Sequence, residues 1–152
     1  MGRLRNRIFQ SWFRLSRPMT LGVRAVVERA DGRILLVRHT YTKGLFLPGG
    51  GVEKAETAHT ALLRELKEEG GVELLATARL HGIYSNHGVF PNDHVLLYRI
   101  APAQWRAGEA TSRGEIAESV WAHPLDLPAD ITPGTGRRLA ELYEDGPNDG
   151  YW

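Results

Sequence analysis

GGVEKAETAHTALLRELKEEGGV, residues 50–72, is the stretch that decides the fold. Its opening glycines follow Pro48 and allow the backbone to adopt a positive φ or to approach a ligand closely. Helical periodicity begins after Thr57, a favourable N-cap residue, and the pair Gly70-Gly71 is typical of a helix C-terminus. The stretch therefore predicts a glycine-rich loop and then one amphipathic helix, whose apolar stripe is Ala58, Ala61, Leu62 and Leu66.

Three carboxylates lie on one face near the end of this helix: Glu65, Glu68 and Glu69. Like charges three and four residues apart repel each other, and the helix dipole disfavours anions in the last turns. A solvated charged face, with Lys67 and Arg64 interleaved, is one interpretation. The other is a site for a hard divalent cation, because Mg²⁺ prefers oxygen ligands.

The spacing of this stretch resembles the signature of the Nudix hydrolases, G-x5-E-x7-R-E-(aliphatic)-x-E-E-x-G-(aliphatic). Gly50, Glu56, the run Arg64-Glu65-Leu66, the pair Glu68-Glu69 and the pair Gly71-Val72 meet every fixed position. The glycine that many members carry before the first glutamate is replaced by Ala55. The resemblance implies an α/β fold, an α/β/α sandwich with a mixed central sheet.

The resemblance also implies an activity, the metal-dependent hydrolysis of a pyrophosphate bond in a nucleoside diphosphate derivative. A nucleotide sugar, ADP-ribose and a nucleoside triphosphate all remain open as substrates. Carried over position by position, the implied Mg²⁺ or Mn²⁺ ligands are Glu65, Glu68, Glu69 and the carbonyl oxygen of Gly49. Arg64 would orient these glutamates through ion pairs, and Glu56 would support them or add a ligand.

The general base that activates water is expected in a loop distant from the signature. Glu115 matches that position in related pyrophosphohydrolases, Glu118 is its rival, and Glu65 is a third candidate. Two residues before the signature, Arg24 and Arg38, are expected to bind phosphates. Aromatic residues expected to stack on a base or to shape the pocket are Phe46, Tyr84, Phe90 and His87. Phe46 is equally compatible with a core position, and His87 is more typical of an ordinary loop residue.

Strands are expected at 20–28, 33–39, 74–84, 94–100 and 116–123, with a turn at Ala30-Asp31-Gly32 between the first two. A closing helix is expected over 134–144. The polar segment SNHGVFPND, residues 85–93, is typical of a recognition loop. These elements form one domain over 19–145, and a C-terminal tail, 146–152, is expected to be exposed.

Residues 1–18 predict a basic amphipathic helix, because Leu4, Ile8, Trp12 and Leu15 recur at helical spacing between arginines. It either packs on its own domain or a second subunit, or contacts a membrane surface weakly through residues 1–17. The first 20 residues hold five arginines and no acid, so the rest of the chain has 14 basic and 18 acidic residues. We therefore expect no stable nucleic-acid binding.

The chain has no cysteine, which excludes disulfides, thiolate metal sites and a cysteine nucleophile. It fits a reducing compartment, and we expect a cytoplasmic enzyme that is either monomeric or a homodimer. Two alternatives to the hydrolase remain. One is a non-catalytic module that senses nucleotides, against which the complete set of signature glutamates argues. The other is a membrane-peripheral hydrolase of a lipid-linked diphosphate.

Overall fold

The computed structural model describes residues 12, 15–16, 18–111 and 114–152. The predicted helix over 1–18, and with it the predicted membrane contact of residues 1–17, lies almost entirely outside these ranges. Within the described ranges, no helix has both the length and the apolar character needed to cross a bilayer.

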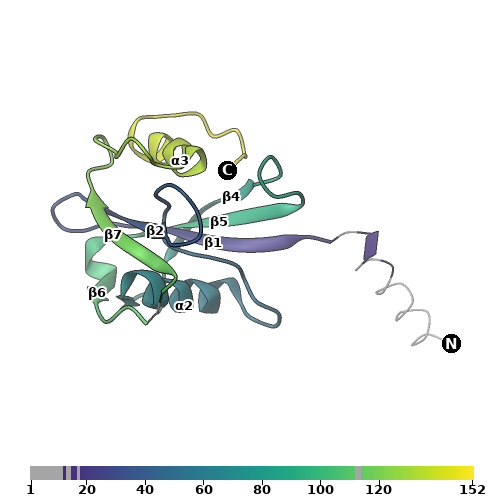
Figure 1. Ribbon diagram of the computed structural model, residues 1–152, viewed down its shortest axis with the longest axis horizontal. Helices are drawn as coiled ribbons and strands as arrows, with labels where there is room; N and C mark the ends of the chain where they lie inside the picture. The colour runs from purple at the N-terminus through teal and green to yellow at the C-terminus, as the bar shows by residue number, and fades with distance from the viewer. Residues whose placement is uncertain (1–11, 13–14, 17, 112–113) are drawn as a thin grey trace.

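A mixed three-stranded sheet is the centre of the molecule (Figure 1). Strand β1 (Thr20–Val27) runs parallel to β5 (Asp93–Ile100), and β5 is antiparallel to β4 (Arg79–Ser85). Two smaller antiparallel pairs complete the strands: β2 (Ile34–His39) with β7 (Ile116–Ala122), and β3 (Val72–Leu74) with β6 (Trp105–Ala107). A short 3₁₀ turn, η1 (Pro102–Gln104), precedes β6.

Helix α2 (Ala58–Gly70) covers one face of the strands and α3 (Pro133–Tyr143) the other, as Figure 1 shows. Each helix closes its own apolar cluster: Leu62 and Leu66 of α2 pack with β1 and β5, and Leu139 of α3 packs with Val26 and Leu97 on the opposite side. The predicted α/β/α sandwich with a mixed sheet is confirmed.

Helix α2 begins and ends at the residues that its capping chemistry predicts. The side chain of Thr57 accepts a hydrogen bond from the backbone N–H of Thr60 at 3.1 Å. At the other end Gly71 adopts the left-handed conformation, with φ of 58°, and its N–H donates to the carbonyl of Leu66. These caps determine where the carboxylates of the last two turns stand.

Three predictions from the sequence need correction, two about strands and one about the C-terminal tail. The turn at residues 30–32 exists, but β1 and β2 separate after it, because β1 pairs with β5 and β2 with β7. The single strand expected over 74–84 is two strands, β3 and β4, that pair with different partners. The tail is not wholly exposed, since Trp152 is partly buried and packs against the cluster beneath α3.

Candidate active site

The glycine-rich loop runs along the outer edge of β1 through backbone hydrogen bonds. The N–H of Val23 donates to the carbonyl of Gly50 at 2.9 Å, and the N–H of Val52 donates to Leu21 at 2.8 Å. The loop is thereby held between β1 and the C-terminal half of α2. Its backbone comes within contact distance of the carboxylates on that helix.

Two glutamates of α2 pack directly on this loop. The backbone N–H of Gly49, which has a φ of 139°, donates to Oε2 of Glu69 at 2.8 Å. A Cβ atom added to Gly50 would lie 2.6 Å from the carboxyl carbon of Glu65. Both glycines are therefore required, the first by its backbone conformation and the second by the close approach of a carboxylate.

A cavity of about 810 Å³ opens beside these carboxylates. The loop and the side chains of Glu65 and Glu69 line it from the side of α2, and the first turn of α3 and Trp152 line it from the side of α3, together with the segment that follows β4. These two sides are its two ends. The volume lies within the range usual for small-molecule sites. The pair Glu65 and Glu69 and the cavity together define the candidate active site.

Burial raises the pKa of both glutamates. Glu69, whose side chain is only 7% exposed, has its pKa raised to about 7 by burial, although the hydrogen bond from Gly49 and the charge of Arg24 oppose the rise. Burial also raises the pKa of Glu65, and the ion pair with Arg64 opposes that rise. The charges of Glu65 and Glu115 add to the rise in the pKa of Glu69, and the charge of Glu68 adds to the rise in the pKa of Glu65. A bound cation would relieve this electrostatic cost.

We expect the metal-free protein to become less stable as the pH rises, because of Glu69. Its folded pKa is about 7 against an ordinary value of 4.5, so the folded chain holds this proton more tightly than the unfolded chain does. The resulting contribution to the free energy of unfolding, about 3 kcal/mol, is complete below pH 4.5 and is lost as the pH rises through about 7.

Urea unfolding of the wild type and of Glu69→Gln in EDTA, at pH 5 and at pH 8, measures this contribution. Since glutamine does not titrate, the variant should gain stability relative to the wild type on going from pH 5 to pH 8. A difference between the two proteins that is the same at both pH values would contradict the assignment.

Arg64 occupies the position of an orienting residue. Its guanidinium donates to both oxygens of Glu56, at 3.0 and 2.9 Å, to Glu65 at 2.7 Å and to the carbonyl of Gly51 at 3.0 Å. These bonds hold the pKa of Glu56 below its usual value. Glu68 stands apart, because its side chain is 40% exposed, lies 3.6 Å from Arg64 and does not line the cavity.

The donor set beside the cavity fits a magnesium-like ion only in part. Among the described residues, no three or more His, Asp or Glu side chains stand together as a complete metal site. Mg²⁺, however, is usually held by one or two carboxylates, with waters and substrate phosphates completing its shell. Glu65, which is partly buried, and Glu69, which is buried, both lie on the cavity wall and meet that requirement.

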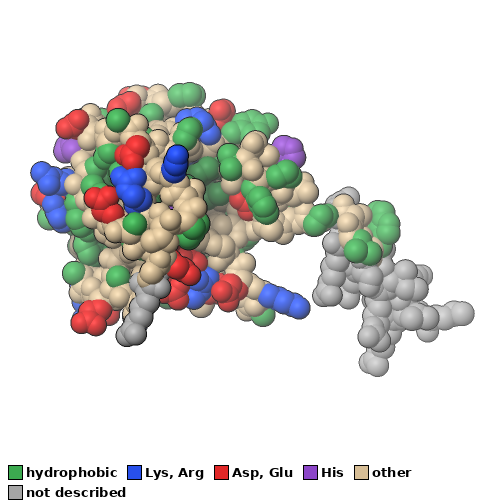
Figure 2. Space-filling view, viewed as in Figure 1, with side chains coloured by type: hydrophobic (Ala, Val, Ile, Leu, Met, Phe, Trp, Pro, Cys, Tyr) green, Lys and Arg blue, Asp and Glu red, His purple; other side chains and the backbone are tan. Residues whose placement is uncertain are grey.

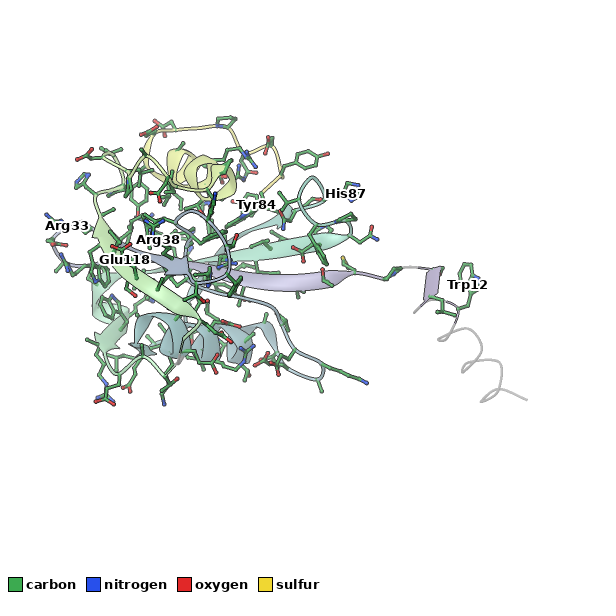
Figure 3. The ribbon with its side chains drawn as sticks, in the orientation of Figure 1. Trp12, Arg33, Arg38, Tyr84, His87 and Glu118 are labelled. Atoms are coloured by element: carbon green, nitrogen blue, oxygen red, sulfur yellow. The ribbon has the colours of Figure 1, made fainter. Side chains whose placement is uncertain are left out.

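Of the candidate bases outside the signature, Glu115 lines the cavity and Glu118 does not. Glu115 is anchored by its backbone, whose carbonyl accepts a hydrogen bond from the N–H of Thr40 at 2.9 Å. Glu118 is occupied on the surface by Arg38, whose Nε lies 3.0 Å from its carboxylate (Figure 3). Position alone therefore separates these two rivals.

Arg24 and Phe46 both line the cavity, as expected of residues that contact substrate. Arg24 donates to the carbonyl of Leu47 at 2.8 Å, and its guanidinium carbon lies 5.7 Å from the centre of the Phe46 ring. Burial lowers the pKa of Arg24, but an arginine remains charged under these conditions. Arg24 is thus a fixed cation close to Glu65 and Glu69.

The structure places two of the predicted substrate-binding residues away from the cavity. Arg38 forms ion pairs with Glu118 and with Asp130, the latter at 2.5 Å, on the surface between β2 and β7. Tyr84 is 1% exposed and points toward α3, where its hydroxyl donates to Glu141 at 2.9 Å (Figure 3). Neither side chain lines the cavity.

His87, considered as a residue that stacks on a base or shapes the pocket, also lies away from the cavity. It is exposed in the segment between β4 and β5 and does not line the cavity. Phe90, from the same segment, does line it. Of the expected recognition loop over 85–93, Asn86, Val89, Phe90 and Asp93 reach the cavity.

The sequence reasoning missed several residues of the site, among them His39 and Trp152. His39 is buried against Glu69, with 3.6 Å between Nδ1 and Oε1, and its ring stacks on Tyr41 at 5.1 Å. Burial lowers the pKa of His39. Trp152, from the tail, lines the far end of the cavity. No local pattern marked either residue, because both reach the site through tertiary packing.

Comparison with known proteins agrees with this geometry. Residues 18–142 match the NUDIX domain family model. The chain is 29% identical over 131 residues, 86% of its length and 83% of the relative's, to a putative 8-oxo-dGTP diphosphatase of Bacillus subtilis. It is 33% identical over 110 residues, 68% of its length and 64% of the relative's, to an ADP-ribose pyrophosphatase of Methanocaldococcus jannaschii.

Solved structures give the same result. A MutT NUDIX hydrolase from Burkholderia pseudomallei superposes with a TM-score of 0.68 at 25% identity, over 81% of this chain and 97% of that one. An ADP-ribose pyrophosphatase from Streptococcus suis superposes with a TM-score of 0.65 at 25% identity, over 88% and 96%. With Gly50, Glu65 and Glu69 of the signature at one cavity and the family model spanning most of the chain, this protein belongs to the Nudix hydrolases.

Proposed function

We propose that this Nudix pyrophosphohydrolase uses Mg²⁺ or Mn²⁺ to cleave the pyrophosphate bond of a nucleoside diphosphate derivative. The observation that carries the proposal is that Glu69, which is buried, and Glu65, which is partly buried, both pack on the glycine loop and line a substrate-sized cavity. Burying two carboxylates is unfavourable unless a cation or a proton neutralises them. Phosphoryl transfer needs little from a protein beyond such placed charge.

The residues at the end of the cavity lined by Glu65 and Glu69 would have different chemical roles. Glu65, Glu69 and the backbone of Gly49 would hold the ion, which supplies neutralisation of the phosphate charge and a more acidic bound water. Glu68 stays a proposed ligand on the strength of the signature alone. Arg64 and Glu56 would maintain the direction of Glu65.

Arg24 and Glu115 line the cavity from other elements of the fold and would face the reacting phosphate. Arg24 would pair with phosphate oxygens, since its charge is fixed in the wall. Glu115 would accept the proton of the attacking water, and the water oxygen would bond to phosphorus as the bridging oxygen leaves with its nucleotide. Phe46 would pack on the substrate beside Arg24.

The substrate class remains between nucleoside triphosphates and nucleoside diphosphates linked to a sugar or ribose. The relatives named as a putative 8-oxo-dGTP diphosphatase and as ADP-ribose pyrophosphatases support both. A phosphate-release screen with added phosphatase separates them. It would cover nucleoside triphosphates, ADP-ribose, nucleotide sugars, dinucleoside polyphosphates and isoprenoid diphosphates, with Mg²⁺, Mn²⁺ or EDTA.

We expect turnover of one nucleotide class with either metal and none in EDTA. Glu69→Gln, assayed alongside, should abolish that turnover. Folded wild-type protein that is silent across the panel, or activity that persists in EDTA, would contradict the proposal. Turnover of isoprenoid diphosphates alone would instead support the lipid-linked alternative.

A further inference from the structure

Residues 148–152 form a short strap that lies beside the end of β4. The N–H of Ser85 donates to the carbonyl of Gly150 at 2.8 Å, and the N–H of Trp152 donates back to Ser85 at 2.9 Å. Figure 1 shows this end of the chain beside β4, next to the segment that joins β4 to β5. The strap therefore places Trp152 directly against the recognition loop.

The indole of Trp152 is held on several sides. A Cβ atom added to Gly134 of α3 would lie 2.5 Å from both Cδ1 and Nε1 of the indole. The ring meets Tyr84 edge to face at 6.1 Å, and the guanidinium of Arg137 donates to the backbone carbonyl of Trp152. A ring fixed in this way presents a preorganised surface to a ligand.

The cavity consequently has two chemically different ends. Glu65, Glu69 and Glu115 provide the anionic end, whereas Trp152, Phe90 and Val89 provide an aromatic and apolar end. Phe90 and Val89 are 54% and 82% exposed, so apolar surface is available there. Figure 2, which colours side chains by type, shows acidic and basic groups mixed over the visible face of the body.

We propose that Trp152 is a specificity-determining residue, whose ring binds the nucleobase of the substrate while the diphosphate lies at the carboxylate end. The proposal rests on the proposed function and extends it, because it selects substrates with a planar aromatic group over diphosphates without one. Stacking on an aromatic side chain is strong and tolerates different bases. The strap thus acts as a wall of the active site.

The first test measures binding in EDTA, with no dependence on turnover. Isothermal titration of the full chain would compare AMP, GMP, CMP and UMP with ribose 5-phosphate, which has no base. We expect at least one nucleoside monophosphate to bind tenfold or more tightly than ribose 5-phosphate. Trp152→Ala should remove this preference, and Trp152→Phe should retain most of it.

The matched control is Tyr151→Ala in the same strap. Tyr151 is 60% exposed and does not line the cavity, so its loss should leave the preference within about twofold. A wild type without preference for a nucleoside monophosphate, or Trp152→Ala with the preference intact, would overturn the proposal. If binding behaves as expected but the wild type hydrolyses nothing, the proposed function fails and the base site stands.

A second pair of variants moves the ring without removing it. Gly134→Ala inserts a methyl group where the indole packs, whereas Gly136→Ala on the same helix meets only Ile131, at 3.8 Å. We expect Gly134→Ala to weaken nucleoside monophosphate binding at least fivefold and Gly136→Ala to leave it unchanged. Equal binding by the two variants would count against a role for the position of Trp152.

Discussion

Replacing Glu69 with glutamine is expected to lower turnover by two or more orders of magnitude while the fold remains intact. Glutamine keeps the shape and still accepts the hydrogen bond from Gly49, but it removes the negative charge that a hard cation requires. Since ionising Glu69 is unfavourable in the metal-free fold, its neutral replacement should not lower the melting temperature in EDTA at pH 8. Initial rates at saturating metal and substrate, with thermal melts in EDTA, measure both effects.

Glu73→Gln is a suitable control for this variant. Glu73 follows α2 on β3, pairs with Arg106 on the surface at 2.8 Å and does not line the cavity. Its rates should stay within twofold of the wild type. If Glu69→Gln also stays within about threefold, Glu69 does not hold the ion and the role passes to other members of the signature.

Glu115→Gln should show the second large effect, a loss in turnover of about 10²-fold or more, the range expected when a general base is removed. The loss should appear mainly in kcat, because Glu115 lies at the cavity while Glu65 and Glu69 are the proposed ligands of the ion. Metal affinity, followed by isothermal titration with Mn²⁺, should change little. Turnover and Mn²⁺ affinity measured together thus distinguish a general base from a metal ligand.

Glu118→Gln is the matched control. Glu118 lies three residues further along the chain, on β7, and does not line the cavity. Its carboxylate is engaged by Arg38, so its loss should leave turnover within about twofold. An equal loss of Mn²⁺ affinity and turnover in Glu115→Gln would make Glu115 a ligand. Full activity in that variant would return the role of base to Glu65.

The fold and the chemistry follow largely from local sequence. Thr57 and Gly71 end the helix α2 because capping is a short-range interaction, and the 3.6-residue period then assigns Leu62 and Leu66 to the core. The same period carries Glu65 and Glu69 to one side of the helix. The spacing was therefore enough to place the two carboxylates on one side of α2. The glycine-rich loop that precedes the helix is the segment on which they pack.

Partners distant in the chain were beyond the reach of local patterns. Arg38 and Tyr84 were predicted to bind substrate. In the structure Arg38 binds Asp130, 92 residues away in the chain, and Tyr84 binds Glu141, 57 residues away. The choice of Glu115 over Glu118 likewise depends on how β7 pairs with β2.

The amino-acid sequence by itself determined the family, the signature helix and the kind of chemistry, since these depend on caps, periodicity and fixed spacing. The tertiary structure decided which aromatic and charged side chains share the cavity, including Trp152, and it placed His39 beside Glu69. The physical reason is the range of the interactions. Capping and periodicity act within a few residues, whereas a cavity wall is assembled from segments whose proximity only the packed sheet and helices create.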